Sequence, residues 1–245
     1  VNIELGATWD LLDNHLAVTA ALFRNERQNY KVADPANPLN PSGEQQLDGK
    51  ARVQGVALGV AGHITDAWSV FANYTYLDSE VLHGVSAYCA ANPNDHLVGT
   101  TPANPDGVNC SNSTHFPDPL KGNPLTNTPK HSGSLFTTYT LPFGLQLGYG
   151  LTYQGSFALN NRALVTPLVA GSTTIVPIYH SDDYLVHRAM LSYTFDEKLT
   201  AQLNVQNFTN EKYYTSIRNN AIFWGDKRTP MVSRDYWTAG RIQQQ

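Results

Sequence analysis

The amino-acid sequence predicts an all-β protein, and more specifically a transmembrane antiparallel up-and-down β-barrel. Three observations support this fold class. Apolar residues recur at every second position, short and long connections alternate along the chain, and aromatic residues crowd the short connections. Charged residues make up only 15% of the 245 residues, against about 25% in an ordinary soluble domain, while aromatic residues reach 11%. A lipid-facing band would account for so little surface charge.

The strand signal is clearest from Leu145 to Tyr153, where Leu and Tyr alternate with Gln, Gly and Thr. Alternation of this kind predicts a strand with two unlike faces. The strands expected from it cover residues 1–9, 16–22, 56–60, 68–76, 135–139, 145–153, 189–193 and 199–205. Their polar faces carry Gln, Asn, Thr and Gly, which suit an aqueous lumen, whereas the inner faces of a soluble sandwich would be apolar.

Connections between these strands alternate strictly in length. Hairpin turns are expected at residues 11–14, 63–67, 141–144 and 195–198, and long polar segments at about 27–46, 79–127, 156–183 and 209–230. Loops beyond about 12 to 15 residues are uncommon in compact soluble domains. Strands that run up and down would place all short turns at one end and all long loops at the other, which is the organisation of an outer-membrane β-barrel.

Aromatic residues lie within one or two positions of the short turns: Trp9, Trp68, Tyr139, Phe143, Tyr193 and Phe195. An interfacial girdle predicts this placement, because an amphipathic ring has an apolar body for lipid and a polar tip for headgroups. The alternative is ordinary aromatic enrichment at strand ends.

Composition and charge exclude other classes. The net charge of -4 argues against a nucleic-acid partner. No apolar stretch approaches the roughly 18 residues of a transmembrane helix. The chain starts without Met and without a signal peptide, so we expect a mature or internal piece of a longer protein. Cys89 and Cys110 are expected to form a disulfide in an oxidising compartment, the alternative being two free thiols.

Eight paired strands and a ninth candidate at residues 231–242 give an odd count, which does not close a bacterial single-chain barrel. Either a strand lies within a long loop or the chain is part of a larger barrel. Open sheet edges in lipid would require partner strands.

Several segments resemble TonB-dependent outer-membrane receptors. The most specific is LNVQNFTNEKYY at residues 203–214, which resembles the penultimate-strand signature of this family. Three further segments are similar to the family in the same order: LLDNHLAVTAALFR at 11–24, VQGVALGVAGHITDAWSVFANYTYLD at 53–78, and NTPKHS at 127–132. The resemblance is to the C-terminal part of the barrel of ferric-siderophore receptors of the catecholate type.

This resemblance implies that residues 1–245 are part of a 22-stranded barrel domain in the outer membrane of a Gram-negative bacterium. It also implies an N-terminal plug, which we expect to be absent from this chain, and energisation by the TonB complex through that plug. Two features depart from the family. The end of the chain, Gln243 to Gln245, lacks the usual terminal aromatic residue, and Arg188 stands where the family often has an inward Asp.

Candidate ligand residues are the aromatic and basic side chains of the long loops, which can meet an anionic ferric catecholate by stacking and charge. The candidates are Tyr88, His115, Arg162, Tyr179, Arg218, Trp224 and Arg228, with His96, Phe116, Lys121, His180, Phe223 and Lys227 as further loop residues of the same kind. The alternative is that most of them are simply solvated.

Metal binding and catalysis find little support. His83, His96 and His115 follow no recognised ligand spacing, and we expect no metal site and no resident cofactor. Iron would arrive as the substrate, already held by its siderophore. No hydrolase, metalloprotease or nucleotide-binding motif is present in the sequence, so we do not expect an enzyme.

The function expected from these features is ferric-siderophore uptake by an outer-membrane receptor, with ferric siderophore, outer-membrane lipid and the TonB complex as partners. One alternative is a small passive barrel of eight to ten strands that serves as a channel or an adhesion scaffold. A second is a structural role in which the fragment associates with other chains through its edges or loops.

Overall fold

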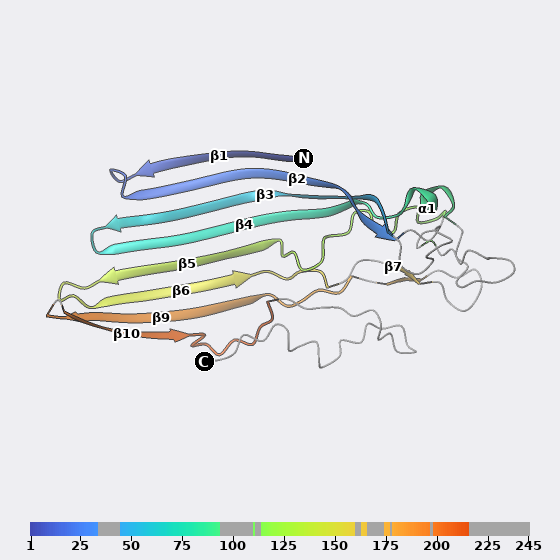
Figure 1. Ribbon diagram of the computed structural model, residues 1–245. Helices are drawn as coiled ribbons and strands as arrows, with labels where there is room; N and C mark the ends of the chain where they lie inside the picture. The colour runs from blue at the N-terminus through green and yellow to red at the C-terminus, as the bar shows by residue number, and fades with distance from the viewer. Residues whose placement is uncertain are drawn as a thin grey trace.

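The computed structural model describes residues 1–33, 45–93, 110, 114–159, 163–165, 174–176, 178–196 and 198–215. Ten strands and one short helix lie in these ranges (Figure 1): β1 Asn2–Leu11, β2 Leu16–Ala33, β3 Gln45–Thr65, β4 Trp68–His83, α1 Ala87–Ala91, β5 His131–Thr140, β6 Gln146–Gln154, β7 Ala163–Val165, β8 Thr174–Val176, β9 Tyr184–Phe195 and β10 Leu199–Gln206. The predicted ninth strand at residues 231–242 lies outside the described residues.

Eight strands form one antiparallel sheet in the order β1-β2-β3-β4-β5-β6-β9-β10, and β7 pairs only with β8. The four short turns lie together at one end of this sheet and the long connections lie at the other, as the alternation of connection lengths predicts (Figure 1). Within the described residues, β1 pairs only with β2 and β10 only with β9. The sheet therefore has two open edges.

Strands β2, β3 and β4 continue into residues that the sequence predicts as loop. β2 runs to Ala33 instead of ending near Leu22, and its pairing with β3 passes two register irregularities on either side of Tyr30. Asn29 relieves the first with a φ of 57°, a left-handed conformation that Asn tolerates better than most residues. The prediction of a loop from residue 27 is wrong because polar and charged side chains do not stop two strands from pairing in water.

The two faces of the sheet differ in the manner that the alternation predicts. Cross-strand register places Trp9, Val18, Val60, Ala72, Leu135, Leu151 and His187 in one row. The neighbouring row on the opposite face contains Thr8, Thr19, Gly59, Asn73, Ser134, Thr152 and Val186. We call these the apolar face and the polar face.

Within the described residues, neither face of the sheet is covered by a hydrophobic core. On the apolar face Leu5 is 72% exposed and Leu203 is 58% exposed. The buried apolar side chains of the described chain lie instead at the long-connection end, where Val81, Val85 and Phe157 are at most 3% exposed. A bare apolar face is expected when hydrocarbon, not protein, is the medium that covers it.

Five of the six aromatic residues near the short turns, namely Trp9, Trp68, Tyr139, Tyr193 and Phe195, lie on this apolar face, and Phe143 lies in the turn between β5 and β6. Trp68 lies directly opposite Tyr139, and its indole Nε1 donates a 2.7 Å hydrogen bond to Thr137 Oγ1. Tyr193 and Phe195 contact each other edge to face with ring centroids 4.7 Å apart. Trp9, Tyr139 and Phe143 are largely exposed, which is the placement that an interfacial girdle requires. Within the described residues, no helix combines the length and the apolar character needed to cross a bilayer.

The assignment of the two faces predicts very different losses of stability for arginine at two adjacent positions in the middle of β6. Leu151→Arg would place a cation on the apolar face and is expected to destabilise the protein by roughly 2 to 4 kcal/mol. Leu147→Arg, in the row of Trp68 and Tyr139 beside the turn, should cost less, about 0 to 1 kcal/mol. Thr152→Arg, on the polar face, should be nearly neutral. Unfolding titrations of the native protein in lipid bilayers measure all three, and equal costs for Leu151→Arg and Thr152→Arg would refute the assignment.

Candidate functional site

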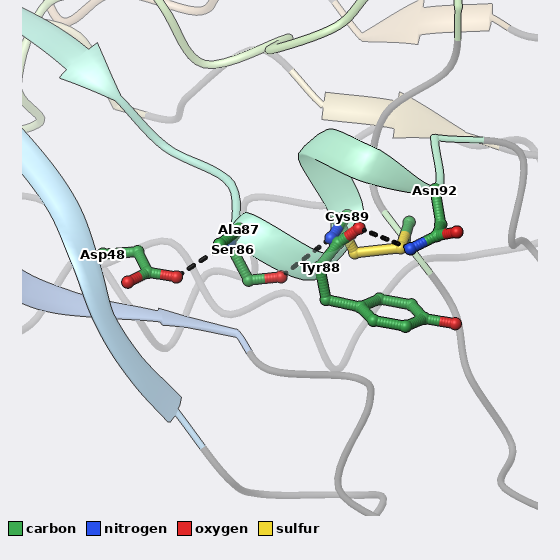
Figure 2. The surroundings of a disulfide bond; sticks show 7 residues. Asp48, Ser86, Ala87, Tyr88, Cys89 and Asn92 are labelled. Carbon is green, nitrogen blue, oxygen red and sulfur yellow. Dashed lines mark hydrogen bonds between the residues drawn. A yellow bond between two sulfur atoms is a disulfide. The ribbon is translucent and has the colours of Figure 1, made fainter.

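The connection between β4 and β5 is held by a disulfide and a short helix (Figure 2). Cys89 and Cys110 are bonded across 21 positions of sequence, and both are buried with Val85. Ser86 caps α1 because its Oγ accepts a 3.2 Å hydrogen bond from the Cys89 amide. Asp48 of β3 accepts a 2.8 Å bond from the Ala87 amide, which ties the helix to the sheet. The loop therefore has a small core of its own.

Asp118 is the main anchor of the same connection. Its Oδ2 accepts hydrogen bonds from the Gly84 amide at 2.8 Å and from His83 Nδ1 at 3.1 Å. Its Oδ1 accepts from the amides of Leu120 and Lys121, both at 3.1 Å. One carboxylate thus joins the end of β4 to a segment 34 residues further along the chain.

Tyr30 extends this anchor to β2. The residue lies opposite Gly49 of β3 at the long-connection end of the sheet, and its hydroxyl donates a 2.9 Å hydrogen bond to the His83 carbonyl. Burial raises the pKa of the Tyr30 phenol, and the charge of Asp118 raises it further. Tyr30 therefore remains a neutral hydrogen-bond donor well above neutral pH.

The connection between β6 and β9 has a second anchor. Phe157 is 2% exposed, and its amide donates a 3.0 Å hydrogen bond to Ser181 Oγ. The Ser181 amide donates back to the Phe157 carbonyl at 2.9 Å. The Asn127 amide donates to the Ala158 carbonyl at 2.9 Å, so this connection is also fixed to the segment before β5. The two long connections are thereby joined near the same end of the sheet.

Only some of the predicted ligand residues belong to the described part of the chain. Tyr88 lies on α1 and packs against the disulfide core. His115 contacts Phe116 edge to face at 4.6 Å between ring centroids, and the Tyr179 carbonyl accepts a 2.8 Å bond from the Leu159 amide. Arg162, Arg218, Trp224 and Arg228 lie outside the described residues, as do His96, Phe223 and Lys227. Ligand contact by these residues stays a prediction.

His83 has a structural partner, because it is bonded to Asp118, and within the described residues no group of three His, Cys, Asp or Glu side chains is placed to hold a metal ion. His96 lies outside the described residues.

A row of aromatic and cationic side chains crosses the polar face. Phe71 of β4 lies opposite Phe136 of β5, Phe136 lies opposite Gly150 of β6, and Gly150 lies opposite Arg188 of β9. Arg188 reaches over Gly150, and its guanidinium carbon lies 4.6 Å from the centre of the Phe136 ring. This is the distance of a cation-π contact. We call these four residues the lumen row.

Glycine at position 150 is what makes this contact possible. A Cβ atom there would lie 2.3 Å from Arg188 Nε, which is closer than any real contact. Phe71 is 64% exposed, so the row presents an open aromatic surface beside a cation. Arg188 is the only Lys, Arg, Asp or Glu on the polar face of β4, β5, β6, β9 and β10, and every residue of these five strands is described.

Sequence reasoning singled out Arg188 only as a departure from the family pattern. Its neighbours Phe71 and Phe136 are separated from it by more than fifty residues, and only the strand register brings them together. The sequence held one signal for this contact: Arg188 stands at a polar-face position of its strand, and the strand at residues 146–154 is rich in Gly.

The comparisons with known proteins agree with this fold. Residues 1–208 match the family described as TonB dependent receptor-like, beta-barrel. The chain is 32% identical over 213 residues to the probable TonB-dependent siderophore receptor PiuA of Acinetobacter baumannii, covering 86% of this chain and 23% of that protein. It is 28% identical over 233 residues to the catecholate siderophore receptor Fiu of Escherichia coli K12, covering 94% of this chain and 24% of that receptor.

Solved structures give the same relationship. The crystal structure of PiuA from Acinetobacter baumannii matches with a TM-score of 0.62 at 30% identity, over 89% of this chain and 25% of that one. The closed form of Fiu from Escherichia coli K12 matches with a TM-score of 0.59 at 27% identity, over 89% of this chain and 24% of that one.

The chain therefore belongs to the TonB-dependent receptor β-barrel family. It spans about a quarter of the length of the relatives named above, so it is a portion of such a barrel. Barrels of this family lie in the outer membrane of Gram-negative bacteria, and the predicted fold class and location are confirmed.

The Asp118 anchor predicts a local loss of order when its carboxylate is removed. Asp118→Ala would leave the part-buried amides of Gly84 and Leu120 without their acceptor, while the Lys121 amide keeps its bond to the carbonyl of residue 118. The β4–β5 connection is expected to open at least about tenfold more often, since an unmet donor costs about 1 to 3 kcal/mol. Limited proteolysis within residues 84–123 measures this opening. Asp182→Ala, an exposed acid in the other connection, is the control, and equal cleavage rates for the two variants would contradict the role of Asp118.

Proposed function

We propose that this chain is part of the barrel of an energised outer-membrane receptor that captures ferric siderophores of the catecholate class and passes them inward. The named relatives support this function, since PiuA is described as a probable siderophore receptor and Fiu as a catecholate siderophore receptor. The observation that carries the proposal for this chain is the lumen row. A ferric catecholate is an anion with aromatic faces, and the row offers a guanidinium beside exposed aromatic rings.

Recognition at the outer end is assigned to the long connections. Tyr88, His115 and Tyr179 stand on segments fixed by the disulfide, by Asp118 and by Ser181. With Arg162, Arg218, Trp224 and Arg228 they supply the residue types that stack on catechols and pair with their negative charge. Fixed supports reduce the ordering cost of binding, because the loop backbone is already held before the ligand arrives.

The remaining parts of the mechanism belong to the longer protein. We propose that a plug outside this chain occludes the lumen and contacts the TonB complex, and that lipid covers the apolar face. Iron enters as cargo within its siderophore, and the proposal assigns no resident cofactor to the chain. Transport needs no covalent step, so the proposal assigns no enzyme activity.

A small passive barrel fits less well. Such a barrel would close by pairing its first strand with its last, whereas β1 and β10 end the sheet as open edges within the described chain (Figure 1). Backbone groups at those edges need partner strands in lipid. A purely structural fragment would use the same two edges to associate with other chains. Further strands of one larger barrel would pair with the backbone groups of these edges without a second protein.

Deletion of the full gene that carries this chain tests the proposed function. In a strain without other catecholate receptors, uptake of radioactive iron from a ferric catecholate should fall to background and return when the gene is restored. Restored uptake that survives removal of TonB would contradict an energised receptor, and unchanged uptake after deletion would contradict the function itself.

The lumen row predicts a specific transport defect. In the full-length receptor, Arg188→Gln should lower the uptake rate at subsaturating ferric catecholate about tenfold, the scale of one charged hydrogen bond. Gly150→Val should have a similar effect, because its side chain would displace Arg188 from Phe136. Gln206→Ala, a neutral polar-face substitution opposite Arg188, is the matched control. Normal uptake by Arg188→Gln at equal receptor abundance would refute the role of the row.

A further inference from the structure

Gly148 of β6 lies beside the lumen row on the polar face of the sheet. It stands two residues before Gly150 and directly opposite Met190 of β9. A Cβ atom at Gly148 would lie 2.8 Å from the Met190 Cβ atom and 3.0 Å from the Met190 Cε atom. Because both ends of the side chain are this close to one backbone position, Met190 lies flat across β6 and does not project into the lumen.

The ring of Phe136 reaches the same position from β5. Phe136 is paired with Gly150, yet its Cζ atom would lie only 3.3 Å from a Cβ atom at Gly148. The ring therefore leans along the sheet toward the short turns, and its tip lies beside the end of the Met190 side chain. Methionine makes favourable contacts with aromatic rings, often at the ring edge.

Arg188 contacts the same ring across the other glycine. Its guanidinium carbon lies 4.6 Å from the centre of the Phe136 ring, and its side chain passes over Gly150. Arg188 and Met190 are two residues apart and therefore share one face of β9. Phe136 is thus held at two points, by a cation over the ring and by a thioether at its tip.

Met190 is an unusual residue for its position. The next two side chains on the same face of β9 are Ser192 and Thr194, which suit an aqueous lumen. Met190 is only half-buried, so no hydrophobic core at this place in the sheet requires an apolar residue. The contact that accounts for it is the one with Phe136. Without that contact the ring could rotate about its side-chain bonds and leave the guanidinium.

We propose that Met190 is a positioning residue of the lumen row. Its thioether holds the Phe136 ring in the orientation in which Arg188 lies over it, so the cation and the aromatic surface are in place before the cargo arrives. This inference rests on the proposed function, because the row is assigned there to the ferric catecholate. Met190 acts on the cargo through Phe136.

A nuclear magnetic resonance measurement tests the contact without any transport assay. The full-length receptor is purified in detergent with its methionines isotope-labelled at the Cε methyl group, and the Met190 signal is assigned by its loss in Met190→Leu. The ring current of Phe136 should shift this signal away from that of a solvated methionine, and Phe136→Leu should return it. Ser192→Ala, at the next polar-face position of β9, should leave it unchanged. A Met190 signal that Phe136→Leu does not move would overturn the proposal.

Uptake kinetics test the effect on the lumen row. In the full-length receptor, Met190→Ala should raise the half-saturation concentration for a ferric tris-catecholate about threefold, and the maximal rate should stay the same. Met190→Leu keeps the volume of the side chain and should restore most of the affinity. Ser192→Ala is the matched control. Wild-type half-saturation in Met190→Ala at equal receptor abundance, or an equal change in Ser192→Ala, would overturn the proposal.

The double variant Arg188→Gln with Met190→Ala separates positioning from an independent role. Once the cation is gone, the orientation of Phe136 no longer matters, so the double variant should be no worse than Arg188→Gln alone. Losses that multiply would mean that Met190 acts by itself, and would overturn the proposal. Absence of ferric catecholate uptake by the wild-type receptor would refute the proposed function instead, and the Met190 signal would then still decide whether Met190 positions Phe136.

Discussion

The need to pair every backbone amide and carbonyl inside hydrocarbon determines the rest of this structure. Water cannot satisfy these groups in a bilayer, so strands must hydrogen-bond to neighbours on both sides. The uninterrupted antiparallel ladder from β1 to β10 meets this demand for the six interior strands. Within the described chain, the outer edges of β1 and β10 have no partner strands. These edges would have to pair with further strands of a larger barrel in the membrane.

Continuous pairing also fixes the two faces, because side chains alternate strictly along a paired strand. The same register that gathers leucines on the apolar face collects Phe71, Phe136 and Arg188 on the polar face, although they are far apart in sequence. At the level of Arg24 the side chains on this face change from apolar to charged, although the strands stay paired. One continuous sheet therefore contacts lipid along its apolar part and headgroups and water beyond it. The buried side chains that anchor the loops are then free to form a small separate core.

Periodicity alone predicted the eight sheet strands and the four short turns. A strand with one face toward lipid and the other toward the lumen needs apolar and polar residues in alternation, and this pattern is visible in the sequence. The end of β2 was misplaced since Glu26, Arg27 and Tyr30 look like loop residues. The partners of Glu26 and Tyr30 that hold the strand are Lys50 of β3 and the His83 carbonyl of β4, which are distant in sequence. Asp118 was invisible as an anchor because its donors depend on loop geometry. The stacking of Arg188 on Phe136 requires the register of three strands, which no local pattern encodes. Four of the seven principal ligand candidates lie outside the described residues, so the outer site stays a sequence-based prediction.

The central claim is that these eight strands form an open arc of a larger barrel, and the distance between its two edges tests this claim directly. Nitroxide labels at Asp10→Cys on β1 and Gln206→Cys on β10, which lie on the polar face in one cross-strand row, allow the distance to be measured by pulsed electron paramagnetic resonance in the full-length receptor. Seven spacings of about 4.8 Å predict an arc of about 34 Å, and hence a label separation of roughly 25 to 35 Å. A separation below about 15 Å would mean that this chain closes a small barrel by itself, and would contradict the account.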